Sequence, residues 1–505
     1  MEHSTQYSRR ARLPLILAAA FVLAFSSVLS AFANVALTQI SADTYTNTSS
    51  QHKTQVEPDT FSFGNTIVMA TQTGRFFDGG ASNIAFARST DGGTTWTGGN
   101  LPGITKHDNP ANPYDRVSDP AVAYDASHNV WMISSLALLE GAGGPSGAAV
   151  LTSRSTNGGV SWSNPVIVSN IGDVDKNWIA CDNTASSPFY GRCYTEWDVF
   201  SENDRVYMST STDGGATWGA RIRPKGGPAG IGGQPVVQPN GKVIVPLANA
   251  SETAIGAFSS TNGGASWSRV TTVAGVSEHT VAGSLRSGAL PSAEIDGAGK
   301  VYVVWEDCRF RSGCTSNDIV MSTSTNGTSW TAVTRIPIDA TTSGSDHFIP
   351  GLAVDKNTSG GTAHLVLTYY FYPVANCTAA TCALSIGSIS STNGGSTWAA
   401  ATQLAGPMTL SWLPNTSQGR MVGDYISTSF NSSGTAHAAF ALANAPTAGG
   451  ADCATATPNC DQATYTTTGG QAAAGATAAA SSAGAANVPA AFDHAGVAGS
   501  EHRHR

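Results

Sequence analysis

The stretch Ser89-Thr-Asp-Gly-Gly-Thr-Thr-Trp96 is the first of six copies of one short motif. The later copies are Ser155–Trp162, Ser211–Trp218, Ser260–Trp267, Ser324–Trp330 and Ser391–Trp398. Successive copies place their tryptophans 66, 56, 49, 63 and 68 residues apart. A constant motif at uneven spacing indicates that one supersecondary unit is repeated, with connecting loops of variable length.

The motif has the chemistry of a tight turn between two strands. Its glycines tolerate positive φ, and its Asp or Asn side chain accepts hydrogen bonds from backbone N–H groups of the turn. Its Trp packs the hairpin onto the sheet. Because the motif contains neither a nucleophile nor a metal cage, we interpret all six copies as structural. The copy at Ser324–Trp330 is one residue shorter, which predicts a slightly different turn.

Residues 114–170 show most clearly what is repeated around each motif. The strands expected there are Asp119–Asp125, Asn129–Ser135, Ala148–Ser153 and Asn164–Ser169. Four antiparallel strands in each period of roughly 40 to 70 residues are typical of a propeller blade. The predicted fold is therefore all-β: a β-propeller of four-stranded antiparallel blades.

The number of blades depends on the two ends of the chain. After the sixth motif, three further strands are expected at 423–430, 435–442 and 462–468, without a fourth. The alternating run Val35–Ser41 can supply the missing strand and close the ring, which would remove an exposed sheet edge. We favour seven blades closed by this N-terminal strand, and six blades is the alternative.

The N-terminal residues 1–33 are predicted to be a signal peptide. Arg9, Arg10 and Arg12 precede the mostly apolar run Leu13–Leu29, and Ala31-Phe32-Ala33 is a small-x-small cleavage site. An uncleaved membrane anchor is the alternative. The remaining predicted segments are 34–56 with the closing strand, the propeller at 57–470, and an Ala/Gly-rich disordered tail at 471–505.

Composition and cysteines favour a secreted protein that does not bind nucleic acid. Charged residues make up 12% of the chain, its net charge is −8, and it has no basic stripe. The eight cysteines form four close pairs, for which we expect local structural disulfides: Cys181/Cys193, Cys308/Cys314, Cys377/Cys382 and Cys453/Cys460. Such bridges form in oxidising compartments. We expect a monomer, without a membrane span after signal cleavage.

The motif consensus S-x-D-x-G-x-T-W resembles the Asp-box, or bacterial neuraminidase repeat. Over roughly residues 57–440 the chain is similar to the sialidase-like propeller superfamily. The resemblance implies an exo-α-sialidase or a related glycoside hydrolase that acts on terminal sugars at the channel mouth. Similar boxes also occur in non-enzymatic proteins, so the alternative is a non-catalytic extracellular propeller that binds glycan or protein. The Phe/Tyr-Arg-Ile-Pro motif expected before the first box is missing, and Arg335-Ile-Pro337 follows the fifth.

Sialidases hold the substrate carboxylate with three arginines, and use a Tyr nucleophile and an acid/base Asp. The residues to inspect lie where each blade's first strand begins, next to the central channel. Arg116, Arg286 and Arg420 hold comparable positions there and are the predicted clamp. The alternative is that each arginine pairs with a neighbouring Asp, such as Asp119 or Asp424.

The remaining site predictions follow from the same positions. The candidate catalytic residues are Tyr425, Asp119, Asp424 and Asp346, and Lys176 and His347 are candidates for substrate binding. Asp59, Asp175 and Gln234 also begin first strands. Asp346 and His347 are either an acid/base pair or cation ligands with Asp175 and Asp119. Calcium would suit such carboxylates, but no loop has a dense Asp pattern, and we predict no cofactor and no metal.

Overall fold

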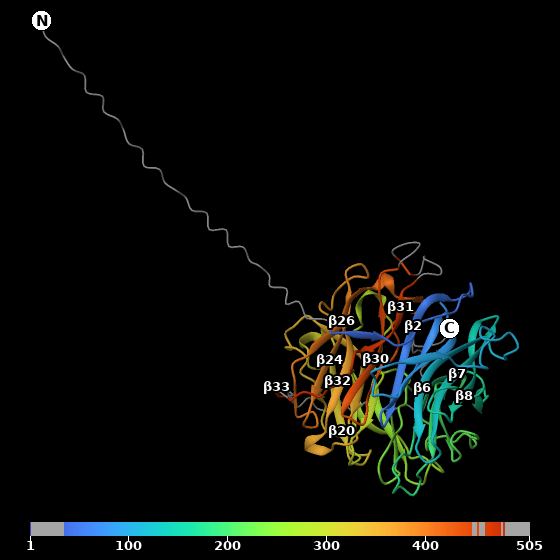
Figure 1. Ribbon diagram of the computed structural model, residues 1–505. Helices are drawn as coiled ribbons and strands as arrows, with labels where there is room; N and C mark the ends of the chain where they lie inside the picture. The colour runs from blue at the N-terminus through green and yellow to red at the C-terminus, as the bar shows by residue number, and fades with distance from the viewer. Residues whose placement is uncertain (2–34, 447–451, 454–459, 476–477, 480–505) are drawn as a thin grey trace. The chain divides into compact units, whose positions relative to one another are not determined.

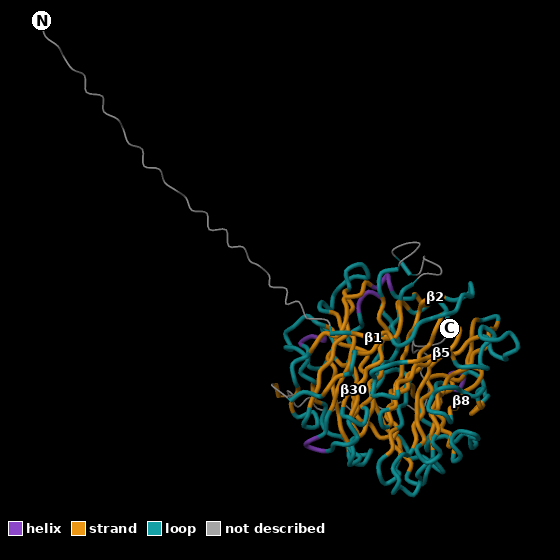
Figure 2. The backbone as a smooth tube through the Cα atoms, viewed as in Figure 1, coloured by secondary structure: helices purple, strands orange, loops and turns teal. Residues whose placement is uncertain are grey.

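The computed structural model describes residues 35–446, 452–453, 460–475 and 478–479, together with Met1. Within these residues the chain is all-β, with strands joined by loops and five short 3-10 turns (Figure 2). The turns are η1 (Phe200–Glu202), η2 (Ala282–Ser284), η3 (Ser312–Cys314), η4 (Gly360–Thr362) and η5 (Leu410–Trp412). None of the described helices is long and apolar enough to cross a membrane. Apart from Met1, the predicted signal peptide lies outside the described residues.

The first half of the chain forms three antiparallel sheets. The largest has two four-stranded halves, joined where Ala81 of β4 pairs with Val117 of β6. Its strands are β2 (Gln51–Phe63), β3 (Thr66–Arg75), β4 (Ala81–Ser89), β5 (Thr97–Asn100), β6 (Arg116–Asp125), β7 (Val130–Gly141), β8 (Gly144–Ser155) and β9 (Val166–Ser169). The next sheet is β10 (Val174–Cys181), β11 (Cys193–Val199) and β12 (Arg205–Ser211). The third is β13 (Gly230–Ile231), β14 (Val236–Val237), β15 (Val243–Asn249), β16 (Ala254–Ser260) and β17 (Thr271–Gly275).

The second half repeats the same pattern of consecutive, neighbouring strands. One sheet is β18 (Ser292–Ile295), β19 (Val301–Asp307), β20 (Asp318–Ser324) and β21 (Thr334–Arg335). Another is β22 (Asp346–Val354), β23 (Leu365–Tyr372), β24 (Ala383–Ser391) and β26 (Thr402–Thr409). The last joins β1 (Leu37–Gln39) to β29 (Ser427–Phe430), β30 (Thr435–Ala443), β31 (Gln462–Thr467) and β32 (Gln471–Ala472). Two small pairs are β25 (Thr397–Trp398) with β33 (Ala478–Ala479), and β27 (Asn415–Thr416) with β28 (Gly419–Arg420).

The predicted pairing of the two chain ends is present. In β1, Leu37 faces Thr467 of β31, and the register continues to Gln39 opposite Tyr465. β30 and β31, drawn in orange to red, lie beside the blue β2 (Figure 1). A hydrogen bond from the backbone N–H of Thr464 to Gln55 Oε1 (2.9 Å) connects β31 to β2. The sheet that ends the described chain is therefore completed by residues from its beginning.

The repeated motif folds as its chemistry predicts. In the first copy Ser89 Oγ donates to Asp91 Oδ1 (2.7 Å) and accepts from the Gly93 N–H (2.8 Å). The Thr95 N–H donates to Asp91 Oδ1 (2.9 Å), and Trp96 Nε1 donates to Gly93 O (3.1 Å). The Thr95 hydroxyl also donates to Asp91 Oδ2 (2.6 Å). This hydrogen bond, followed by those from the Thr95 N–H and the Ser89 hydroxyl, lowers the pKa of Asp91.

The shorter fifth copy differs as predicted. Its Ser324 hydroxyl accepts from the N–H three residues on, at Gly327 (2.8 Å), rather than four residues on. Asn326 Oδ1 likewise accepts from the Ser329 N–H (2.8 Å).

Two strand predictions need refinement. β29 begins at Ser427, four residues later than Gly423, because Gly423 has φ 143° and interrupts the extended backbone. β2 begins at Gln51, within the segment we assigned to the region before the propeller. In the predicted disordered tail, β32 pairs with β30 and β33 pairs with β25, while residues 476–477 and 480–505 lie outside the described residues.

The apolar core is divided among neighbouring pairs of sheets. One cluster packs Ile244 of β15 and Ile255 of β16 against Val303 and Trp305 of β19. Another packs Ile84 of β4 in the same cluster as Val117, Trp131 and Ile133 of β6 and β7. Branched and aromatic side chains suit such pleated, two-sided packing. Each sheet is therefore held by its neighbours, a propeller-like arrangement.

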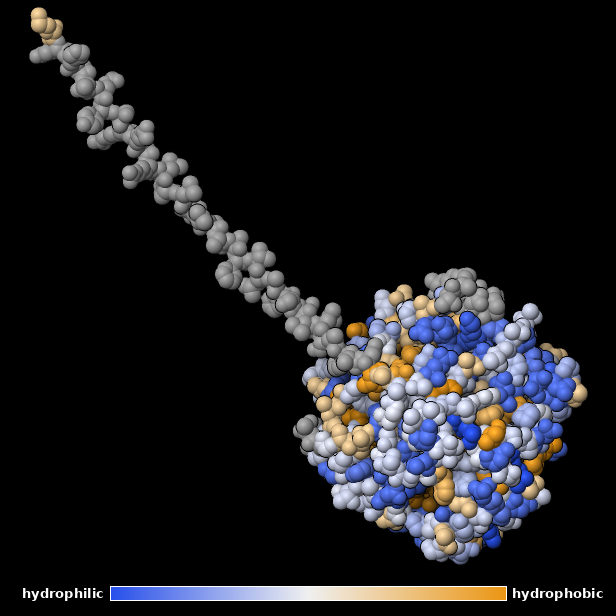
Figure 3. All heavy atoms as spheres, viewed as in Figure 1, coloured by the Kyte–Doolittle hydropathy of each residue, from blue (hydrophilic) through white to orange (hydrophobic). Residues whose placement is uncertain are grey.

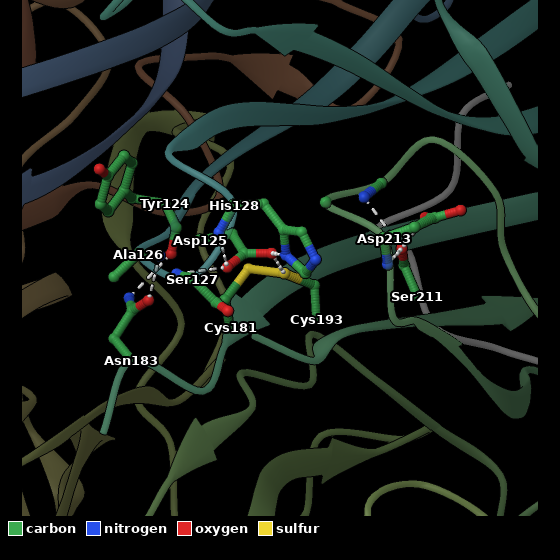
Figure 4. Close-up of a disulfide and its surroundings, with 12 residues drawn as sticks. Tyr124, Asp125, Ala126, Ser127, His128, Cys181, Asn183, Cys193, Ser211 and Asp213 are labelled. Atoms are coloured by element: carbon green, nitrogen blue, oxygen red, sulfur yellow. Dashed lines mark hydrogen bonds and ion pairs between the residues drawn. A yellow bond between two sulfur atoms is a disulfide. The ribbon is translucent and has the colours of Figure 1, made fainter. Parts of the chain in front are cut away.

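All four predicted disulfides are present: Cys181–Cys193, Cys308–Cys314, Cys377–Cys382 and Cys453–Cys460. Cys181 and Cys193 lie opposite each other in β10 and β11 (Figure 4). Beside this bridge, Asn183 donates to Tyr124 O and accepts from the Ala126 N–H, both at 2.8 Å. The bridge thus staples a loop that also contacts the preceding sheet. Disulfides of this kind are typical of oxidising compartments.

Candidate functional site

The first strands β2, β6 and β10 each carry a bulge at or beside a candidate site residue, namely Asp59, Asp119 and Lys176. The pairing register shifts in β2, β6 and β10, and the shifted residues Glu57, Asp119 and Lys176 have φ of 53°, 50° and 50°. Such a conformation is rare for residues other than glycine, and bulges redirect side chains. Here they bring charged side chains from three strands into one buried cluster.

The centre of this buried cluster is Asp424. It forms ion pairs with Lys176 Nζ and with Arg286, whose Nε donates to Asp424 Oδ1 at 2.7 Å. Its backbone N–H donates to Glu57 Oε1 (3.3 Å), and Lys176 Nζ lies 3.9 Å from the same oxygen. All four residues are buried. The two basic and two acidic residues of this cluster are therefore one another's partners.

Burial and charge set the protonation of the cluster. Burial raises the pKa of Glu57 to about 8, and Asp119 and Asp424 add to the rise. Burial also disfavours the charged form of Lys176, but the neighbouring carboxylates, Asp424 above all, raise its pKa. Burial lowers the pKa of Arg75 to about 10. The positive charge of Arg286 acts in the same direction, and the charge of Glu57 opposes the shift. At neutral pH the basic side chains therefore stay charged and pair with the Asp424 carboxylate, whereas Glu57 is mostly protonated.

Tyr425 lies against this cluster but points to a backbone carbonyl. Its hydroxyl donates to Pro120 O (3.0 Å), and its ring makes a T-shaped contact with Trp178, with the ring centroids 5.0 Å apart. Burial raises the pKa of Tyr425 well above its usual value. Asp119 accepts from Ser118 Oγ (2.9 Å). The structure therefore gathers Tyr425, Asp119 and Asp424 with Lys176 and Arg286.

The other two candidate arginines lie elsewhere. Arg116 pairs with Asp78 and Glu140, and its guanidinium covers the Phe76 ring at 4.0 Å. Arg420 donates to both carboxylate oxygens of Asp452 at 2.9 Å. Each of the three arginines thus has an acidic partner, as our alternative interpretation states, although Arg116 and Arg420 have partners other than the expected Asp119 and Asp424.

Asp346 and His347 have partners outside the buried cluster around Asp424. Asp346 accepts from the Asn317 N–H (2.6 Å) and lies 3.4 Å from His279 Nδ1, and burial raises its pKa to about 6. His347 Nε2 lies 3.7 Å from Asp339, and burial lowers its pKa. Consecutive residues of a strand point to opposite faces, so β22 keeps the two side chains apart.

One set of described residues has spacing that would suit a metal ion: Asp318, Asp339 and His347. Two guanidinium groups already bind its carboxylates. Arg311 and Arg335 each pair with both Asp318 and Asp339. Because fixed cations neutralise these carboxylates, we interpret the set as an ion-pair network rather than a metal site.

A cavity of about 370 Å³ lies along the later halves of the first strands, away from the buried charged cluster around Asp424. Its walls come from β2, β10, β14, β18, β22 and β29, with Val122 of β6. Trp178 and Gln234 line both this cavity and a space of about 10 Å³ that reaches Asp119, Lys176 and Tyr425. The buried charged cluster thus lies behind the inner end of the cavity.

Hydroxyl, amide and carboxyl groups line this cavity. Hydroxyls come from β2 and β29, including Thr60 and Ser429, which lie 3.2 Å apart. The Asp59 carboxyl accepts from the Val122 N–H (2.6 Å), and burial raises its pKa to about 7. Glu294 of β18 also faces the cavity, and its side chain remains 24% exposed.

Aromatic side chains mark both ends of the cavity. Trp178 lies at the inner end, and Phe61 and Phe63 lie at the outer rim. Phe63 is 41% exposed and packs at a tilt against Tyr124, with the ring centroids 4.4 Å apart. Hydroxyl, amide and carboxyl groups flanked by aromatic rings can hydrogen-bond and stack on a sugar.

Sequence reasoning identified Asp59 but missed Glu57, Arg75 and Glu294. Glu57-Pro58 has the same acidic-residue-then-proline pattern as Asp119-Pro120, and both residues form bulges. That recurrence was a usable signal for Glu57. Arg75 and Glu294 stand in no comparable pattern, and only the tertiary structure places them near the channel.

The match to a family model agrees with the repeat. Residues 147–352 match the family model described as a BNR repeat-like domain. A search of curated proteins found no match. Among solved structures, an ulvan lyase is similar at 11% identity with a TM-score of 0.48, covering 88% of this chain and 96% of that chain. The NanB sialidase from Streptococcus pneumoniae is similar at 11% identity and TM-score 0.41, covering 85% and 70%.

A further solved structure is the intramolecular trans-sialidase from Ruminococcus gnavus. It is similar at 13% identity and TM-score 0.39, covering 80% of this chain and 93% of that chain.

Proposed function

Because the chain carries a BNR repeat-like domain, we propose that it is an exported carbohydrate-binding protein whose ligand occupies the channel cavity. The observation that carries the proposal is the cavity itself. It combines hydroxyl, amide and carboxyl groups with Trp178 inside and Phe63 at the rim. Sugars present hydroxyls at their edges and C–H groups on their faces, and this lining offers a partner for each.

The proposal includes the number of blades and export through a signal peptide. We infer seven blades, closed by β1, because seven first strands contribute residues to one cavity. Export through the signal peptide at 1–33 is supported by the four disulfides.

A glycan array tests the binding proposal. The wild-type protein should retain a subset of glycans, and Phe63→Ala should weaken that binding about ten-fold because its exposed ring is lost. Phe77→Ala is the matched control, since Phe77 is 53% exposed and does not line the cavity. Equal binding by both variants, or no glycan bound by the wild type, would contradict the proposal.

A second candidate function is glycoside hydrolysis of the exo-α-sialidase type at the strand-start end of the channel. The observation in its favour is that Asp119 of β6 gathers there with Arg286, Asp424 and Tyr425, which lie in the loops before β18 and β29. A fluorogenic sialoside tests it, together with a panel of other aryl glycosides. Turnover that disappears in Arg286→Ala and Tyr425→Phe would support catalysis, and absence of turnover across the panel would leave binding as the activity.

A further inference from the structure

We infer that the ligand of the channel cavity carries a protonated amine beside its hydroxyls, and that the cavity selects amino sugars over acidic sugars such as sialosides. This inference rests on the proposed carbohydrate-binding function and adds the charge of the ligand. It depends on which charged groups face the cavity and on what each of them already binds.

The charge of the lining is one-sided. The charged side chains that line the cavity are Asp59, Glu294, Asp296, Asp355 and Lys356. None of the described lining residues is an arginine or a histidine. Recognition of a sugar carboxylate favours the planar fork of an arginine. An acidic sugar would therefore meet carboxylates without a matching guanidinium.

Two of the four lining carboxylates, Asp296 and Asp355, accept hydrogen bonds from loop residues. Asp296 accepts from the backbone N–H groups of Lys300 (2.9 Å) and Gly360 (2.8 Å). Asp355 accepts from the N–H and side-chain amide of Asn357, at 2.9 and 3.0 Å. These contacts fix turns, so neither carboxylate is needed to explain ligand selection.

Asp59 and Glu294 are different because the cation nearest to them among the described lining residues is Lys356, whose side chain is 53% exposed. Asp59 accepts from the Val122 N–H and lies near Ser427, and Glu294 accepts from the Ile295 N–H (3.3 Å). Burial raises the pKa of both carboxyl groups, and the charge of Glu294 adds to the rise for Asp59. Both carboxyl groups line the same cavity, and a ligand cation beside them would favour their ionised forms, whereas a ligand carboxylate would not.

The one lining cation does not reverse this conclusion. Lys356 Nζ lies 4.0 Å from Glu294 and 4.9 Å from the Phe61 ring centroid, and its side chain is 53% exposed. It lies on the solvent side, where water screens its charge. The interior therefore presents carboxyl groups, hydroxyls and Trp178 to the ligand.

Three sugars, of which two differ only in N-acetylation, test this inference by calorimetry near neutral pH. The probes are a glucosamine oligomer, its N-acetylated counterpart of equal length, and a sialyllactose. We expect the amine form to bind about ten-fold more tightly than the acetylated form, and the sialoside to bind weakest. Glu294→Gln and Asp59→Asn should remove most of the preference for the amine. Glu202→Gln, a carboxylate outside the cavity lining, should keep it.

Each other outcome overturns the inference in a distinct way. Equal binding of amine and acetylated oligomers would refute amine selection while the carbohydrate-binding proposal stands. Tighter binding of sialyllactose would reverse the assigned ligand charge. Calcium binding that both variants abolish, without any gain for the amine, would make the pair a metal site instead. No binding of any sugar would refute the proposed function itself.

Discussion

Arg286, in the loop before β18, and Asp424, three residues before β29, form a buried, two-point ion pair. Arg286 Nε donates to Asp424 Oδ1 at 2.7 Å, and Nη2 donates to Oδ2. Lys176 Nζ contacts the same carboxylate from β10. One carboxylate thus joins three parts of the chain that are far apart in sequence, and its removal would leave two buried cations without their nearest partner.

Asp424→Ala should therefore be strongly destabilising. Breaking one side of a buried pair typically costs about 3–5 kcal/mol. The measurement is urea unfolding followed by tryptophan fluorescence. The control is Asp452→Ala, which removes the partly exposed partner of Arg420 and should cost about 0–1 kcal/mol. Similar losses in the two variants would mean that the cluster is not a stability element.

The structure predicts different costs for alanine at two glycines of the repeated turn, the second glycine of the first copy and the first glycine of the second copy. Gly93 has φ 91°, and an added Cβ would overlap the His437 ring, whereas Gly158 has φ 74° with no atom within 4 Å. Gly158→Ala should cost only the strain of positive φ, about 1–2 kcal/mol. Gly93→Ala should cost clearly more, because the first hairpin must also move away from β30. Thermal unfolding of both variants measures this, and equal costs would refute the contact.

Asp59 should make the folded protein less stable as pH rises from acid to neutral. Burial raises its pKa to about 7, whereas an unfolded Asp titrates near 4. Between these values the folded state holds a proton that the unfolded state has lost, so the free energy of unfolding falls as pH rises. The full effect is up to about 4 kcal/mol.

Asp59→Asn measures that effect directly. The amide oxygen can still accept from the Val122 N–H, but it does not titrate. Urea unfolding at about pH 5 and about pH 8 should give a smaller loss for the variant than for the wild type. Parallel pH profiles would show that Asp59 titrates normally in the folded protein.

Removing residues 35–41 should destabilise the protein and promote association. The deletion removes β1 and exposes the edge of β31, which can then pair with another chain. Size-exclusion chromatography and thermal unfolding should report larger species and a lower Tm. Thr38→Ala is the control: it removes only the exposed hydroxyl contact with Thr468 and keeps the strand. A monomeric deletion variant with unchanged Tm would contradict this prediction.

The local parts of the structure were predictable from sequence because they depend on neighbouring residues. The turn at Ser89–Trp96 carries its own hydrogen-bond partners, and each disulfide joins cysteines at most 12 positions apart. The pairing of β1 with β31 was also predictable, since a sheet without a fourth strand needed one.

The partners of charged side chains were not predictable. Arg116 pairs with Asp78 and Glu140, and Arg420 with Asp452, none of them the neighbours that sequence suggested. Such pairs depend on how loops from different repeats meet. The cavity was missed for a related reason. Attention to strand starts overlooked Glu294, which lies further along β18, and only the joint packing of the first strands leaves space there.

The join between β1 and β31 also sets an order of events for a newly made chain. Leu37 pairs with Thr467, so the first described strand must wait for almost the whole polypeptide before its partner exists. Contacts between such distant residues form slowly, because a long loop has to close first. A chain exported before it folds would reach the far side of the membrane with its first strand unpaired, and its architecture would be completed only when the C-terminal segment arrives.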